Sequence, residues 1–131
     1  MAVLLNHTIV PARDKEASAT FLAEILGLPV GKPFGPFVQL HVGESLSLDF
    51  ADVDVAGQGV TDVAPHHYAF QVDDAEFDEI FNRIVEAGIA YYAEPHEPHR
   101  YGEINTWRGG RAVYFNDPNG HILEVLTVPS P

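Results

Sequence analysis

The sequence contains no cysteine and few basic residues. The absence of cysteine excludes disulfide bonds, a thiol nucleophile and thiolate metal ligands. Any bound metal ion must therefore be held by histidine or carboxylate side chains. The chain has 7 Lys and Arg residues against 19 Asp and Glu residues, which gives a formal net charge of −12. Because this charge repels polyanions and anionic lipid surfaces, we expect neither nucleic acid nor a membrane as a partner.

Long hydrophobic runs are also missing. No segment approaches the ~18 apolar residues of a membrane-spanning helix. The N-terminus lacks the basic and long apolar regions of a secretion signal. We therefore expect a cytoplasmic protein. Its 131 residues, of which 46% are hydrophobic, are enough for a single domain with its own core.

One pattern occurs twice along the chain. Residues 7–14 align without a gap on residues 67–74, with His over His at the first position and Asp over Asp at the last. Near the ends of the two halves, Leu-Asp-Phe at 48–50 aligns with Leu-Glu-Val at 123–125. An internal repeat of this length indicates two copies of one structural unit. We place the first module at residues 1–60 and the second at 61–131 of the single domain.

Each half has the pattern of a strand, a helix and three further strands. The first strands are predicted over residues 3–11 and 66–72. The later strands are predicted near 28–32, 36–42 and 45–51 in the first half, and near 89–93, 111–116 and 121–127 in the second. The fold class is therefore α+β, with two βαβββ modules.

The two predicted helices differ in the clarity of their apolar stripes. The second helix carries an apolar stripe at helical spacing, formed by Phe77, Ile80, Phe81, Ile84 and Val85. The first helix is expected to bury another stripe, formed by Ala17, Phe21, Ile25 and Leu28. Asp14 and Asp73 are the predicted N-caps, since Asp readily accepts hydrogen bonds from the first free N–H groups of a helix.

Three polar side chains lie at repeat-related or strand positions that suit a metal. Because side chains alternate along a strand, His7 and His67 are predicted to point away from the helices in both modules. Glu124 is a carboxylate among apolar neighbours, and an unpaired buried carboxylate is costly. A metal held by the two imidazoles and this carboxylate would supply its partner and leave positions free for substrate or water. His121, directly after a turn, is expected to be exposed.

The most specific motif is the segment 114–125, in which an Asp-Pro-Asn-Gly turn precedes the strand that carries Glu124. Together with residues 6–10, residues 67–72 and the duplicated unit, it resembles the vicinal oxygen chelate superfamily. That superfamily includes glyoxalase I, extradiol dioxygenases, fosfomycin-resistance thiol transferases and bleomycin-binding proteins. The resemblance covers nearly the whole chain.

The resemblance implies a curved mixed sheet around a metal cleft. It assigns one divalent ion (Fe, Mn, Ni or Zn) to His7, His67 and Glu124, and it implies a homodimer. A fourth ligand in glyoxalases is usually Glu, where this chain has Asp49, which is shorter by one methylene. Whether Asp49 binds the metal directly or acts as a catalytic base beside Glu124 is left open.

The stretch between Glu94 and Arg111 has no counterpart of its length in the first half, and long loops are often functional. We expect residues 95–110 to form a mobile lid. Together with Arg111 directly after it, the lid is expected to contribute an anion-binding group of substrate contacts: Arg100, Trp107 and Arg108. Tyr114, on the following strand, is either a core aromatic or a further substrate contact.

Two classes of function fit this pattern. The first is a metal-dependent enzyme on a small, oxygen-rich, anionic substrate: a glyoxalase-like lyase or isomerase, an extradiol-type dioxygenase, or a thiol transferase. The second is a metal-free protein that sequesters a drug or metabolite, as bleomycin-resistance proteins do. The ligand set distinguishes them, because a protein that only binds its ligand has no need of His7, His67 and Glu124 together. This chain has all three, which favours the enzyme.

Overall fold

The computed structural model describes residues 3–129, apart from the side chain of Arg108. It divides into two compact units, Met1–Ala64 and Pro65–Pro131. The division falls after Ala64 rather than after residue 60, where the sequence pattern placed it.

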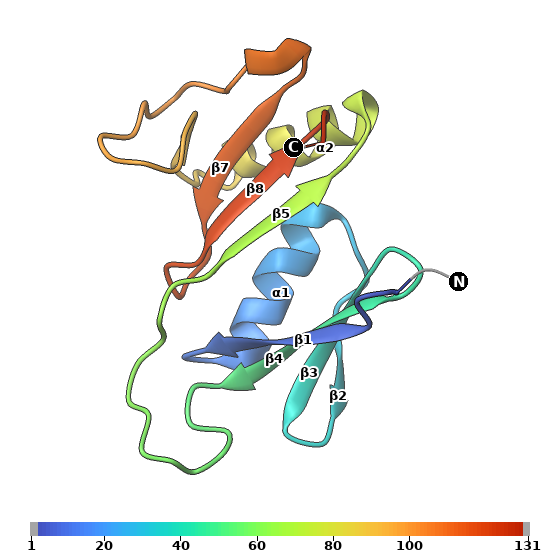
Figure 1. Cartoon of the computed structure of the whole chain (residues 1–131), viewed down its shortest axis with the longest axis vertical. Coiled ribbons are helices and arrows are strands. Elements are labelled where there is room, and N and C mark those ends of the chain that lie inside the picture. Colours follow the sequence, from blue (N-terminus) through green and yellow to red (C-terminus); the bar gives the residue numbers. More distant parts are fainter. Residues whose placement is uncertain (1–2, 130–131) are drawn as a thin grey trace. The chain divides into compact units, whose positions relative to one another are not determined.

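The first unit is a four-stranded mixed sheet with one helix (Figure 1). Its elements are β1 (His7–Ala12), α1 (Lys15–Leu26), β2 (Lys32–Phe34), β3 (Phe37–Val42) and β4 (Leu46–Asp52). The strand order is β1-β4-β3-β2, with β1 parallel to β4 and the other pairs antiparallel. β1 begins later than predicted, because its ladder with β4 starts at His7 opposite Ser47.

The second unit repeats this arrangement. Its elements are β5 (His67–Gln71), α2 (Asp74–Glu86), β6 (Tyr91–Tyr92), the 3-10 turn η1 (Trp107–Gly109), β7 (Ala112–Asn116) and β8 (Ile122–Leu126). The strand order is β5-β8-β7-β6, with β5 parallel to β8. The predicted α+β class and the duplicated βαβββ order are therefore confirmed. None of the helices in residues 3–129 is long and apolar enough to cross a membrane.

Both helices begin where the sequence predicts. The carboxylate of Asp14 accepts hydrogen bonds from the backbone N–H groups of Glu16 and Ala17, each at 3.1 Å. Asp73 accepts one from the N–H of Glu76 at 2.8 Å. These bonds satisfy N–H groups that have no partner within the helix.

The buried helix faces only partly match the predicted stripes. On α2, Phe77, Ile80 and Ile84 are buried, whereas Val85 is 50% exposed. On α1 the prediction was wrong for Ala17, which is exposed. That helix instead buries a side made mostly of small residues, Ser18, Ala19, Leu22, Ala23 and Ile25. Small side chains allow the helix to lie close to its sheet, so its buried face does not stand out as a stripe of large apolar residues.

Side-chain alternation along β7 and β8 separates the core of the second unit from its site. Val113, Phe115, Leu123 and Val125 are at most 2% exposed and form the core with Phe77 of α2. The intervening positions, including Tyr114 and Glu124, point to the other face of the sheet. The candidate site lies on this second face.

Candidate functional site

His67 and Glu124 meet on one face of the second sheet. β5 and β8 run parallel, with His67 opposite Ile122 and Ala69 opposite Glu124. The register brings Nε2 of His67 to 3.1 Å from Oε1 of Glu124. Glu124 is 9% exposed, whereas the His67 side chain is 46% exposed. The pair therefore sits at a surface opening with its carboxylate largely buried.

The second nitrogen of His67 fixes how the ring is protonated. Its Nδ1 lies 3.0 Å from the carbonyl oxygen of Ile122. A carbonyl oxygen only accepts, so Nδ1 must carry the proton. In the neutral ring Nε2 is then a lone-pair acceptor, and it faces a carboxylate oxygen that is an acceptor as well. Two acceptors this close require a cation between them or a proton shared by the imidazole and the carboxylate.

A divalent metal fits this pair. Ligand atoms bound at about 2.1 Å and at right angles to each other lie about 3 Å apart, close to the observed separation. The Nδ1–carbonyl bond is the usual support of a metal-binding imidazole. His67 and Glu124 would supply two ligands, and His7 belongs to the other unit. Within either unit, the described residues include no group of three His, Asp or Glu side chains that could hold a metal.

Tyr114 is the cross-strand neighbour of Glu124. Burial, followed by the negative charge of Glu124 and a hydrogen bond to it, raises the pKa of Tyr114 to about 12. The phenol is therefore protonated at neutral pH and donates its hydrogen to the carboxylate. The Tyr114 ring also stacks with that of His67, with 6.1 Å between ring centroids. Tyr114 is thus part of the site rather than of the core.

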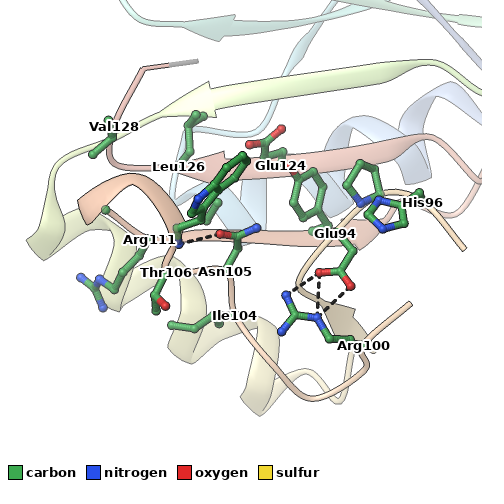
Figure 2. A pocket seen from close by; sticks show the side chains of 15 residues that line it. Glu94, His96, Arg100, Ile104, Asn105, Thr106, Arg111, Glu124, Leu126 and Val128 are labelled. Carbon is green, nitrogen blue, oxygen red and sulfur yellow. Dashed lines mark hydrogen bonds and ion pairs between the residues drawn. The ribbon is translucent and has the colours of Figure 1, made fainter. Parts of the chain in front are cut away.

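A cavity of about 1120 Å³ opens beside this pair. Figure 2 shows the side chains around it, which come from the long loop, β7, β8 and the segment after β8. The polar lining includes Glu94, His96, Arg100, Asn105 and Glu124, and the apolar lining includes Pro95, Ile104, Trp107, Leu126 and Val128. The predicted loop therefore contributes directly to a substrate-sized pocket. Whether the loop moves as a lid stays a prediction.

The arginines expected to bind an anion have partners within the chain. The guanidinium of Arg111 bonds to Asp78 at 2.7 Å and to Asp74 at 3.1 Å, both on α2. It also lies 4.3 Å from the ring centroid of Phe77. Arg100 is paired with Glu94. Arg111 therefore ties the start of β7 to α2, and it also lines the pocket, so its role as a substrate contact stays a prediction. The side chain of Arg108 lies outside the described residues.

The first unit carries a related but different arrangement. Asp49, at the repeat position of Glu124, is 5% exposed and accepts hydrogen bonds from Ser47 at 2.5 Å and Gln39 at 3.4 Å. It shares a pocket of about 550 Å³ with His7, whose Nδ1 lies 2.8 Å from Asn6. Because neighbouring side chains satisfy the Asp49 carboxylate, its burial does not require a metal.

The expectation that His121 is exposed was wrong, since it is fully buried. Its Nδ1 accepts a hydrogen bond from the backbone N–H of His66 at 2.8 Å. The next residue, Ile122, donates its N–H to the carbonyl of His66 at 2.8 Å and accepts from the His67 ring. Residues 121 and 122 therefore hold both the backbone before His67 and its imidazole. The turn motif alone does not indicate that the backbone N–H of His66 needs a side-chain acceptor.

We expect His121→Leu to lower divalent-metal affinity by about 10- to 100-fold, the usual effect of losing a group that orients a ligand. His121→Asn should keep most of the affinity, because the amide oxygen can occupy the place of Nδ1. Nitrogen NMR of the metal-free chain should show a proton held on Nδ1 of the His67 ring in the wild type and in His121→Asn, and partial loss of that proton from Nδ1 in His121→Leu. Equal metal affinities in the two variants would show that His121 only fills space.

Comparison with known proteins identifies the family. The family profile described as a glyoxalase-like domain matches residues 5–128. The chain belongs to the glyoxalase-like domain family. This places it in the vicinal oxygen chelate superfamily, as the motifs predicted. The glutathione transferase FosA of Serratia marcescens is 31% identical over 124 residues, which cover 92% of this chain and 78% of that protein.

Two oxidases are among the solved structures that this chain resembles. Oxidase ChaP-H1 is 56% identical with a TM-score of 0.89, and the match covers 98% of both chains. Oxidase ChaP-H2 is 52% identical with the same TM-score, covering 98% of this chain and 96% of that one. A lactoylglutathione lyase from Agrobacterium tumefaciens, at 24% identity and a TM-score of 0.71, shares the fold. The similarity to transferases and oxidases supports a metal-dependent enzyme of the glyoxalase superfamily.

Proposed function

We propose that this chain is a metal-dependent oxidase that uses molecular oxygen on a small substrate with two neighbouring oxygen atoms. The observation that carries the proposal is the His67–Glu124 pair, whose two lone-pair atoms face each other at 3.1 Å beside a substrate-sized pocket. Oxidation is favoured over lyase or isomerase chemistry by the oxidase at 56% identity, since the lyase at 24% supports the fold alone.

His7 is the proposed third ligand, since it occupies in the first module the position that His67 has in the second. The site would be completed by His7 of the same chain or of a second copy, and we propose a homodimer. Sedimentation at micromolar protein concentration measures the oligomeric state directly. A divalent ion bound there supplies a Lewis acid to neighbouring substrate oxygens.

The surrounding residues have separate roles in this proposal. Glu124 holds the ion, and Tyr114 orients its carboxylate through a hydrogen bond. The apolar lining of the pocket excludes water from the substrate. Asp49 is assigned the role of catalytic base. Metal binding by Asp49 is not part of the proposal, because its carboxylate already accepts from two side chains.

The test is the metal content of the purified chain and the co-substrate that it consumes. We expect about one divalent ion per chain, and oxygen consumption, followed with an oxygen electrode, when catechols or α-hydroxyketones are supplied. Loss of glutathione in the presence of fosfomycin, without oxygen uptake, would instead make the chain a thiol transferase like its Serratia relative. A chain that binds these compounds without retaining any metal would be a sequestering protein, and the proposal would be wrong.

A further inference from the structure

The large pocket presents a carboxylate other than that of Glu124. Glu94 follows β6, and its side chain is only 16% exposed. It lines the same cavity as Tyr114 and Glu124 (Figure 2). Its negative charge is close enough to Tyr114 to contribute to the raised pKa of that phenol. Glu94 therefore lies in the substrate space but on a different part of its wall from the His67–Glu124 pair.

Arg100 holds the Glu94 carboxylate from the solvent side. The Nε of Arg100 donates to both carboxylate oxygens at 2.8 Å, and Nη2 donates to one of them at 2.5 Å. Arg100 is 52% exposed, so the carboxylate is the inner member of the pair and the guanidinium the outer one. An arginine–carboxylate contact of this kind fixes the orientation of the carboxylate and also keeps it ionised.

The backbone of the same loop is also anchored. Nδ1 of His99 donates to the carbonyl oxygens of Glu94 at 3.1 Å and His96 at 3.2 Å. The His99 ring stacks on Tyr92 with 3.9 Å between centroids. The N–H of Ala93 donates to the carbonyl of Arg100 at 3.3 Å. Glu94 is thus held at both its backbone and its side chain before any ligand arrives, which reduces the entropic cost of recognition.

The charge state of Glu94 decides what it can recognise. The hydrogen bonds from Arg100 hold the pKa of Glu94 below its usual range. A carboxylate that stays ionised is a constant hydrogen-bond acceptor and a weak base. Arg100 offsets its charge, so the pair has no strong attraction for a cation. A neutral donor, such as a hydroxyl or an amide N–H, matches it best.

We propose that Glu94 is a specificity-determining residue that accepts a hydrogen bond from a hydroxyl or N–H group on the part of the substrate away from its neighbouring oxygens. For Arg100 this differs from the expectation that it binds an anion, since Arg100 positions an acceptor instead. The inference refines the substrate of the proposed oxidase. Recognition by Glu94 does not itself depend on the metal, so the two ideas can fail separately.

The experiment uses the full chain, loaded with redox-inert Zn²⁺ and also metal-free. Trp107 is the only tryptophan and lines the pocket, so its fluorescence reports occupancy. The probes are 4-(hydroxymethyl)catechol and 4-(methoxymethyl)catechol, together with the same pair substituted at position 3. Within each pair, only the hydroxymethyl compound has a hydrogen-bond donor on its side group. The anionic probe is 3,4-dihydroxybenzoate. The variant is Glu94→Ala. Its matched control is Glu103→Ala, which removes the other carboxylate bonded to Arg100 but lies outside the pocket lining.

We expect the wild type to bind at least one hydroxymethyl probe about tenfold more tightly than its methoxy counterpart, the usual effect of one hydrogen bond to a charged group. The preference should disappear in Glu94→Ala and persist in Glu103→Ala. Equal binding of every pair, survival of the preference in Glu94→Ala, tightest binding of the benzoate to the wild type, or no binding of any probe would each overturn the inference. A Glu94-dependent preference in a chain that retains no Zn²⁺ would overturn the oxidase proposal alone.

Discussion

Replacing Glu124 by Gln should lower the affinity for divalent metal by roughly 100-fold or more, a loss at least as large as those seen for supporting residues. The neutral amide oxygen is a much weaker ligand than the carboxylate. The same substitution should leave the metal-free chain as stable as the wild type, or more stable. The reason is that the new amide N–H can donate to Nε2 of His67, which now faces an acceptor at 3.1 Å. Chelator competition measures the affinity, and urea unfolding measures the stability.

Asp49→Asn is the matched control, since it makes the corresponding change at the repeat-related carboxylate of the first unit. We expect that variant to keep its metal, because Asp49 is bonded to Ser47 and Gln39 rather than held for a cation. Undiminished metal affinity in Glu124→Gln would remove Glu124 from the ligand set. Loss of metal in Asp49→Asn would make Asp49 the fourth ligand, as in glyoxalases.

Truncating Phe77 to Ala should lower the free energy of unfolding by about 3–5 kcal/mol, the usual cost of deleting a buried aromatic ring. Phe77 is 0% exposed on α2 and stacks with Phe81 at 6.1 Å between centroids. Its ring also lies under the guanidinium of Arg111. The truncation therefore leaves a cavity and removes a cation–π contact. Urea denaturation followed by circular dichroism gives the value.

Val85→Ala is the control on the same helix, because Val85 belongs to the same predicted apolar stripe but is 50% exposed. Its effect should be below about 1 kcal/mol, as is usual for an exposed site. Similar losses in the two variants would mean that the face of α2 packed on the sheet is not the one described. Pure sequence periodicity predicts equal effects, so this pair tests the packing itself.

The duplicated order of helices and strands could be read from the sequence because the signals that set it are local. Alternation along a strand, helical spacing and a carboxylate cap each depend on a few neighbouring residues. The same alternation predicted that Glu124 points away from the helix, and the register places its carboxylate 3.1 Å from His67. The buried side of α1 escaped this reasoning because small residues give little periodic contrast.

Local sequence patterns were enough to predict the family, the duplicated unit and the face of the sheet that carries His67 and Glu124. The pairing of charges and the burial of polar groups became visible only in the folded chain. Arg100, Arg111 and His121 show why such contacts could not be predicted from the sequence. In sequence each could equally face water, a substrate or another part of the chain. Their partners are Glu94, two carboxylates of α2, and a backbone N–H 55 residues away. Contacts of that kind depend on where separate elements meet in space, and no local pattern encodes them.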